Sequence, residues 1–263
     1  EIPEGSKTSK GRAIQNLINI EQDDKVKAFI NTQDLKDTEY VNSHYVVMAT
    51  KKGQIKKTSL EKYSRPRING INAITIKEND ELLEAKLTNG NSEILMAVKS
   101  GKAIRFEESK TRPMGRSASG VRGIRLKDDK DEVIGMVSVN DVSTDMLVVS
   151  KNGYGKRSSL EDYRITNRGG KGVKTISITE KTGSLVAIKN VSDENDLMII
   201  NKSGIAIRMS VEKLRVMGRA TQGVKLINLK GEDTIAAVAK VIKEDETDDN
   251  SQENSAENED LSI

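Results

Sequence analysis

The segment Arg168-Gly169-Gly170-Lys171-Gly172-Val173-Lys174 decides the fold, because its last glycine belongs to a series that recurs at nearly fixed intervals. The members of this series, which we call the anchor glycines, are Gly70, Gly120, Gly172 and Gly223. They are separated by 50, 52 and 51 residues, and Gly11 stands 59 residues before the first of them as a divergent copy. A repeat period close to 50 residues is typical of propeller-like arrays.

Each anchor glycine opens a short run in which apolar residues alternate with small or polar ones. The apolar pairs in these runs are Ile74/Ile76, Ile124/Leu126, Ile176/Ile178 and Ile227/Leu229. Side chains of a β-strand alternate between its two faces, so both members of a pair lie on one face, which we expect to be buried. Near Gly11 the same pair, Ile18 and Ile20, fits only when three extra residues are allowed.

Two further apolar runs follow in the repeats and predict two more strands. The first follows an acidic turn in most copies and covers residues 26–30, 82–87, 133–137, 185–188 and 235–241. The second is more continuous and covers residues 45–49, 94–98, 146–149 and 197–200. Continuous apolarity is typical of a central strand that is covered on both faces.

A second glycine series marks a tight turn after the continuous run and predicts a fourth strand. These glycines are Gly53, Gly101, Gly153 and Gly204. Glycine supplies the left-handed residue that a short hairpin needs. The strand that leaves each turn carries a cation four residues after the glycine, namely Lys57, Arg105, Arg157 or Arg208. The chain therefore predicts an all-β array of four complete four-stranded repeats and a partial fifth.

Arginines recur in the loop before each anchor glycine. In three repeats they stand eight and four residues before it, as Arg112/Arg116, Arg164/Arg168 and Arg215/Arg219. Arg65 and Arg67 precede Gly70, and Lys7 stands four residues before Gly11. Unrelated surface charges would not keep this phase. If the repeats stand side by side, these loops lie on one rim and form a cationic belt that suits the phosphates of curved duplex DNA.

The glycines of the quoted segment suit close contact with phosphates. Gly169, Gly170 and Gly172 let the backbone approach, while Arg168 and Lys171 supply positive charge. The segment is not a Walker sequence, because neither serine nor threonine follows the lysine and a strand rather than a helix is predicted next. The candidate set for phosphate binding also includes the cations just after the anchor glycines and those four residues after the turn glycines, namely Arg122, Lys174, Lys225, Lys57, Arg105, Arg157 and Arg208. Seven aromatic residues, with no Trp, give poor support for a stacking platform for single strands.

Catalysis has little support in this sequence, because a nucleophile or general base needs partner groups and few candidates exist. His44, the only histidine, lies in an insertion at residues 34–44 that predicts a surface loop. Tyr63 and Tyr163 end two predicted single helical turns at equivalent places and are interpreted as packing residues. Zero cysteines exclude disulfides, thiolate metal sites and a cysteine nucleophile.

The charge distribution is asymmetric although the net charge is only +3. Residues 243–263 hold nine acids and one lysine, so without their −8 the body at residues 1–242 carries +11. A basic body favours polyanionic partners, and the acidic tail lacks apolar periodicity, so we expect it to be disordered and to compete with DNA for the rim. No signal or membrane segment is present, since the apolar runs are short, and we expect a cytoplasmic protein.

Several motifs together resemble the C-terminal domain of bacterial DNA gyrase A. They are Gly120-Val-Arg-Gly-Ile-Arg125, Asn152-Gly-Tyr-Gly-Lys-Arg157 and Gly218-Arg-Ala-Thr-Gln-Gly-Val224, followed by the acidic tail. The family box Gln-Arg-Arg-Gly-Gly-Lys-Gly matches Arg168 to Gly172 in its last five positions, whereas Thr166 and Asn167 replace its first two. That match lies in a later repeat than the family's box, so it resembles a degenerate copy, and most of a first blade is expected to precede this chain.

The resemblance implies a β-pinwheel, a propeller-like ring of four-stranded blades with an exchanged strand. It implies that residues 1–242 wrap double-stranded DNA without sequence specificity on a basic rim, as a non-catalytic module with no cofactor of its own. In the family this wrapping directs negative supercoiling by an A2B2 complex of gyrase A and gyrase B that uses ATP and Mg, in the bacterial cytoplasm at the nucleoid. The alternatives are a domain like the C-terminal domain of topoisomerase IV, which selects substrates, and a propeller that scaffolds proteins.

Overall fold

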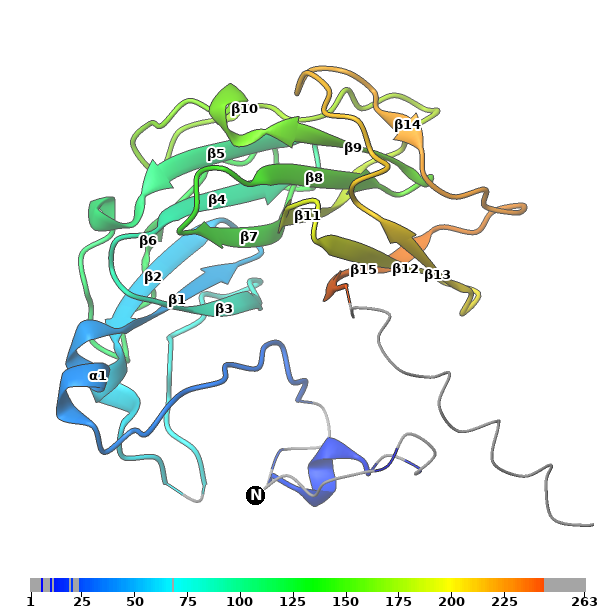
Figure 1. Cartoon of the computed structure of the whole chain (residues 1–263). Coiled ribbons are helices and arrows are strands. Elements are labelled where there is room, and N and C mark those ends of the chain that lie inside the picture. Colours follow the sequence, from blue (N-terminus) through cyan, green and yellow to red (C-terminus); the bar gives the residue numbers. More distant parts are fainter. Residues whose placement is uncertain are drawn as a thin grey trace, which may run out of the picture.

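The computed structural model describes residues 6, 10, 12–18, 20, 24–67 and 69–243. Lys7 and nearly all of the predicted acidic tail lie outside these residues. Within them the fold is predominantly β, with three four-stranded antiparallel sheets and one three-stranded sheet that follow one another along an arc (Figure 1). We call the sheets blades A to D in chain order. The predicted all-β array of repeated blades is confirmed.

The blades share one strand order from the inner to the outer edge. Blade A consists of β3 (Leu82–Thr88), β1 (Tyr45–Thr50), β2 (Gln54–Ser59) and β6 (Val121–Arg122). Blade B consists of β7 (Val133–Val139), β4 (Glu93–Val98), β5 (Lys102–Glu107) and β10 (Val173–Lys174). Blade C consists of β11 (Leu185–Val191), β8 (Asp145–Ser150), β9 (Tyr154–Ser159) and β14 (Val224–Lys225). Blade D consists of β15 (Ile235–Ile242), β12 (Asn195–Asn201) and β13 (Ala206–Ser210).

The outermost strand of each four-stranded blade comes from the next repeat along the chain. After β9, for example, the chain passes through η4 (Leu160–Asp162), crosses back to blade B and adds β10 beside β5. It then returns to blade C as the inner strand β11. Neighbouring blades are therefore joined by backbone hydrogen bonds as well as by packing. Figure 1 shows β6, β10 and β14 on the outer side of the arc and β3, β7, β11 and β15 on the inner side.

Hydrophobic cores fill the spaces between neighbouring blades. On β4, Ile94 and Met96 pack into the core shared by blades A and B, whereas Leu95 and Ala97 pack into the core shared by blades B and C. The middle strand β8 likewise divides its side chains between the cores on its two sides. A strand with two buried faces needs apolar residues throughout, so the prediction from the continuous runs is confirmed.

Three local predictions are corrected by the structure. The runs after Gly120, Gly172 and Gly223 pair over only two residues, and the run after Gly70 forms no strand. Two of the second apolar members, Ile76 and Ile178, are exposed. Residues 26–30 form no strand, because the equivalent strands β3, β7, β11 and β15 each pair with a middle strand that precedes them in the chain, and the described residues before 26 contain no such strand. The insertion contains the helix α1 (Thr38–Ser43), capped by the Asp37 carboxylate, rather than a loop alone.

The predicted helical turns that reach Tyr63 and Tyr163 are confirmed as short 3-10 helices. They are η2 (Leu60–Tyr63) and η4, and η3 (Glu108–Lys110) holds the equivalent place in blade B; η1 (Ile14–Asn16) lies before α1. Each of η2, η3 and η4 starts the loop that crosses to the preceding blade position. These turns therefore set the direction in which the arginine loops leave the blades.

The anchor glycines are required where an outer strand approaches its neighbour. A Cβ on Gly172 would lie 2.7 Å from the Ala103 carbonyl carbon, and Gly172 has φ +69. We expect Gly172→Ala to lower the free energy of unfolding by about 2–3 kcal/mol, because the left-handed backbone is strained and β10 must move off β5. Urea unfolding measures this. Gly70→Ala is the matched control, since φ is +72 but nothing lies within 4 Å; an equal loss there would contradict the close-approach explanation.

Candidate nucleic-acid interface

The arginine loops of successive blades lie in phase along the outer side of the array. Three of the loops each make one parallel bridge with β2, β5 or β9 of the preceding blade, and the bridges are Lys57 with Pro113, Arg105 with Ile165 and Arg157 with Val216. These three loop residues each stand seven positions before an anchor glycine. The sequence phase is therefore also a spatial phase, and equivalent arginines repeat from blade to blade.

Most predicted cations of these loops are exposed. We call the following set the arginine belt: exposed Arg65, Arg67, Arg112, Arg122, Arg164, Lys171, Lys174, Arg215 and Lys225, with half-buried Arg116, Arg168 and Arg219. Lys7, the remaining member predicted from the sequence, lies outside the described residues. Among the described belt members, the ones four residues before the anchor glycines are the half-buried ones. Two of the half-buried arginines, Arg168 and Arg219, also have a role within the loops.

Arg168 and Arg219 make the same hydrogen bonds one repeat apart. Arg168 donates from Nε to the Lys110 carbonyl at 2.9 Å and from Nη1 to the Arg122 carbonyl at 3.1 Å. Arg219 donates to the carbonyls of Asp162 and Lys174, at 2.9 and 2.8 Å, from the same two nitrogens. A guanidinium has five N–H donors, so each arginine can fix its loop and still present donors to a ligand.

Backbone hydrogen bonds join the belt loops to one another across the seams between blades. The Gly169 N–H donates to the Gly123 carbonyl at 2.6 Å, and the Arg125 N–H donates to the Gly170 carbonyl at 2.8 Å. The same link recurs between Ser177 and Thr221 at 3.0 Å. Gly169 and Gly170, which the sequence predicted to approach phosphates, thus make backbone contacts between blades. Gly169 has φ +81, a left-handed conformation that favours glycine. A cavity of about 250 Å³ beside them is lined by residues including Arg164, Lys171 and Gly172.

The cations four residues after the turn glycines have a different environment, and we call them the latch cations: Lys57, Arg105, Arg157 and Arg208. Arg105 is 8% exposed, pairs with Glu93 at 2.5 Å, and donates from Nη1 to the carbonyls of Leu160 and Tyr163 in blade C. Lys57 is 5% exposed and pairs with Glu108 of blade B at 2.7 Å. The Lys57–Glu108 ion pair and the hydrogen bonds from Arg105 to blade C therefore link neighbouring blades.

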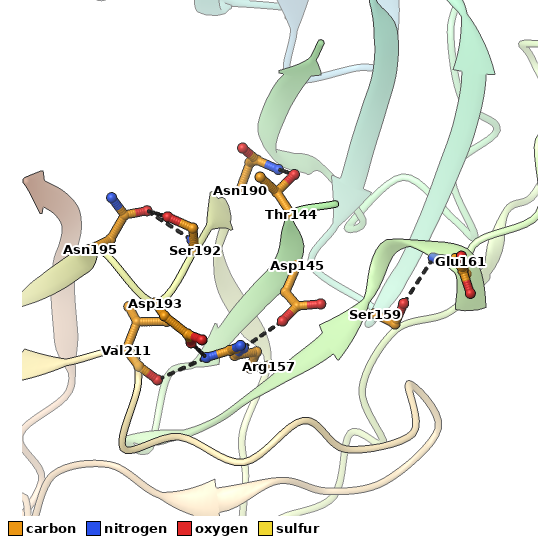
Figure 2. A network of polar contacts seen from close by, with 10 residues as sticks. All are labelled: Thr144, Asp145, Arg157, Ser159, Glu161, Asn190, Ser192, Asp193, Asn195 and Val211. Atoms are coloured by element: carbon orange, nitrogen blue, oxygen red, sulfur yellow. Dashed lines mark hydrogen bonds and ion pairs between the residues drawn. The ribbon is translucent and has the colours of Figure 1, made fainter. Parts of the chain in front are cut away.

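Arg157 repeats this arrangement between blades C and D, as Figure 2 shows. Its Nε lies 2.5 Å from the Asp145 carboxylate, and its Nη1 donates to Asp193 at 2.5 Å and to the Val211 carbonyl at 3.2 Å. Arg208 in blade D pairs with Asp196 at 2.7 Å, and its side chain is 43% exposed. The structure therefore places Lys57, Arg105 and Arg157 in the seams between blades, apart from the exposed belt.

The latch cations carry a sequence signal that the repeat phase alone does not reveal. In three repeats an acid stands 12 residues before the arginine on the partner strand of the hairpin, as Glu93, Asp145 and Asp196. In blade A the same place is held by Tyr45, whose ring centroid lies 4.0 Å from Lys57 Nζ. A fixed acid–arginine separation across a tight hairpin indicates an internal ion pair rather than a free cation.

The tyrosines and the histidine have structural surroundings. Tyr163 is fully buried in the core between blades B and C, and its hydroxyl shares a hydrogen bond with Thr175. Burial raises the pKa of Tyr163 to about 12, which is unsuited to a general base near neutral pH. His44 is partly buried, and its Nδ1 lies 2.9 Å from the Tyr40 carbonyl oxygen. The interpretation of the tyrosines as packing residues is confirmed for Tyr163.

The described residues form neither a metal-ligand cluster nor a membrane-spanning helix. No group of three or more His, Cys, Asp or Glu side chains there is arranged to hold a metal ion. In the same part of the chain, the helices are too short and too polar to span a membrane.

The sequence is similar to a known protein family and to proteins within it. The sequence model of the family described as DNA gyrase C-terminal domain, beta-propeller, matches residues 1–33, 44–89, 92–140, 144–192 and 195–242. The chain is 44% identical over 261 residues to the DNA gyrase A protein of Staphylococcus aureus strain MRSA252. That match covers 99% of the chain but only 29% of the relative, so this chain spans less than a third of the relative's length.

Solved structures share the fold. A structure described as that of the DNA gyrase A C-terminal domain superposes with a TM-score of 0.77 at 25% identity, covering 89% of this chain and 76% of the other. The C-terminal domain of DNA topoisomerase IV superposes with a TM-score of 0.80 at 22% identity, covering 88% and 71%. The second similarity concerns the fold alone.

Proposed function

This chain belongs to the DNA gyrase C-terminal domain family, and from that premise we propose that it binds and wraps duplex DNA along the arginine belt. The observation that carries the proposal is the spatial phase of the belt. Equivalent arginine loops repeat once per blade on the outer side of a curved array, and hydrogen bonds across the seams join them. A curved row of cations is complementary to a bent polyanion.

The physical basis of the wrapping is backbone contact. The belt offers guanidinium and ammonium groups, and the seam glycines bring the backbone close to the surface, so phosphates of any sequence are suitable ligands. Bending a duplex costs about 1–6 kcal/mol for a site of a few helical turns, and the binding of phosphates along successive blades offsets that cost. A fixed displacement between blades would give the wrapped DNA one handedness. Weak sequence preference follows, because no base edge needs to be read.

The function of the whole protein is part of this proposal. As a segment of gyrase A, the chain would act in an A2B2 complex with gyrase B in the bacterial cytoplasm at the nucleoid. Wrapping would present one DNA segment to another with a defined crossing sign, so that strand passage introduces negative supercoils. Strand cleavage and the use of ATP and Mg are assigned to other parts of the complex, and this chain is proposed as a non-catalytic module.

Salt dependence tests the electrostatic basis of the proposal. If the belt neutralises about six to ten phosphates, log affinity is expected to fall linearly with log salt with a slope of about −5 to −9. Fluorescence anisotropy with labelled duplexes of two unrelated sequences, titrated at several salt concentrations, measures the slope. Affinity that ignores salt, or that is confined to one of the two sequences, would overturn phosphate-based wrapping.

A topological assay separates gyrase-type wrapping from the alternatives. Ligating nicked circular DNA in the presence of the chain traps any writhe that the chain imposes. Gyrase-type wrapping predicts trapped supercoils of one sign that increase with protein concentration. Salt-sensitive binding without trapped supercoils would favour substrate selection of the topoisomerase IV type, and no DNA binding would favour a protein scaffold.

A further inference from the structure

Two lysines are buried directly beneath the belt. Lys56 on β2 is 0% exposed, and Lys156 on β9 is 1% exposed. Both stand three residues after a turn glycine, where blade B has Ile104. Among the described residues, the partners of both ammonium groups are carbonyl oxygens, and neither lysine forms an ion pair with an acid. Burying a charged group without a counterion costs free energy, so other polar groups must stabilise these two ammonium groups.

Each ammonium is held by carbonyl groups of a belt loop. Lys56 Nζ donates to the Ala73 carbonyl at 2.6 Å and also to the carbonyl of Arg116 in the next blade's loop. Lys156 Nζ donates to the Gly218 carbonyl at 2.5 Å, in the loop that carries Arg219. Carbonyl oxygens carry partial negative charge, so these bonds are charge-assisted and draw the loop towards the blade.

The loops also rest on the stems of these lysines. A Cβ placed on Gly120 would lie 3.2 Å from Lys56 Cβ, and one on Gly223 would lie 3.3 Å from Lys156 Cβ. In blade B the loop touches an apolar side chain at a neighbouring position, because a Cβ on Gly170, two residues before the anchor glycine, would lie 3.4 Å from Ile104 Cδ1. The same position therefore supports a belt loop in three blades, by an ammonium in two of them and by a methyl group in one.

We propose that Lys56 and Lys156 are positioning residues of the DNA-binding belt, each fixing the arginine loop of the following blade from beneath through its ammonium group. This inference rests on the proposed function. It adds that the belt has a buried layer of charge, which acts on DNA through the exposed arginines and need not touch a phosphate.

We expect DNA binding to change the protonation of these two lysines. Burial, and then the nearby Arg116, lower the pKa of Lys56 to about 8. Burial also lowers the pKa of Lys156 to about 8, with Asp162 opposing and Arg219 adding to the decrease. The hydroxyl of Tyr63 shares the Ala73 carbonyl with Lys56. Phosphates bound at the belt would favour the charged lysines, so DNA binding near pH 8 is expected to take up protons.

The expected size of this effect follows from linkage. At pH 8 each lysine is about half protonated, so two lysines can take up at most about one proton in total. If DNA raises each pKa by about one, the affinity falls about fivefold per lysine between about pH 7 and pH 9. Fold stability has the opposite sign: between about pH 8 and pH 10.5 the unfolded chain binds more protons, so these lysines make folding more favourable as pH rises.

The test uses the full chain, a mixed-sequence duplex, and the double variant Lys56→Ile/Lys156→Ile, which copies the apolar support found in blade B. Calorimetry in two buffers of different ionisation enthalpy gives the protons taken up on binding, and anisotropy gives the affinity at each pH. We expect the variant to stay folded, to bind DNA several-fold more weakly at pH 7, and to lose the proton uptake. Lys189→Ile, on the inner strand β11, controls for the loss of a positive charge and is expected to keep the uptake.

The outcomes distinguish this inference from the proposed function. If the wild-type chain does not bind DNA, the proposed function fails. If the wild-type chain binds DNA with the expected salt dependence but the double variant shows equal affinity and equal proton uptake, the positioning role is overturned. A variant that only loses thermal stability, with an unchanged pH profile of DNA binding, also overturns it, because a purely structural role would not alter that profile.

Discussion

Replacing Arg116, Arg168 and Arg219 together by alanine is expected to lower the affinity for duplex DNA by about 10- to 150-fold at moderate salt. This range assumes that each arginine contributes about 0.5–1 kcal/mol to the binding free energy and that the three contributions add. The slope of log affinity against log salt should become less negative by about three, because each arginine neutralises about one phosphate. The supercoils trapped on nicked circles should nearly disappear, since Arg168 and Arg219 also fix their loops through the carbonyls of neighbouring segments. Each single variant should cost little.

Two further variants separate charge from loop positioning. Arg168→Lys/Arg219→Lys keeps the charge but removes the fork that bonds two carbonyls, so we expect near-normal affinity with fewer trapped supercoils. Lys86→Ala/Lys189→Ala/Lys240→Ala removes three positive charges from the inner strands β3, β11 and β15 and should leave both measurements close to wild type. An equal loss in this control, or one arginine accounting for nearly all the affinity, would contradict a distributed belt.

Arg105→Met is expected to lower the free energy of unfolding by about 3–5 kcal/mol, the largest stability effect that we expect of a single substitution here. The change leaves the Glu93 carboxylate, whose side chain is 17% exposed, without its partner. It also removes the hydrogen bonds that Arg105 Nη1 donates to two carbonyl oxygens of blade C. Urea unfolding measures the loss, and the transition should broaden if blades B and C separate before the rest.

The matched control for Arg105 is Arg208→Met, because Arg208 holds the same repeat position but pairs only with Asp196 and is 43% exposed. A cost of about 0.5–1 kcal/mol is expected there. Adding Glu93→Leu to Arg105→Met should recover much of the loss, since two apolar side chains replace the pair. Equal costs at Arg105 and Arg208, or a DNA salt slope that changes as much as for a belt arginine, would overturn the assignment of Arg105 to the seam.

The repeat architecture could be predicted from the sequence because its signals are local. Glycine at a turn, alternation in a strand and a continuous run in a middle strand each depend on neighbouring residues, and the period of about 50 residues repeats them. The partner of the outer strand could not be read in this way. Val173 pairs with Ala103, 70 positions earlier, and periodicity carries no information on which blade accepts a strand.

The candidate site was harder to predict, because phase alone does not separate exposed from buried cations. Arg157 and Arg164 both recur from repeat to repeat, yet one lies in a seam and the other is exposed. The difference depends on acids brought close by the hairpin, such as Asp145. The lysines beneath the belt were missed for a related reason, since a lysine next to an arginine in a strand is normally interpreted as a second surface charge.

The exchanged outer strand has a consequence for how such arrays change length over evolution. The gene segment that encodes one repeat supplies strands to two sheets. A deletion of the segment that runs from the first to the last strand of blade D would therefore also remove β14, which belongs to blade C. A deletion from one anchor glycine to the next, such as residues 120–171, would instead bring the Gly172 strand to the vacated edge of β2. Anchor glycines are therefore the points at which unequal recombination could add or remove a blade and leave every edge paired.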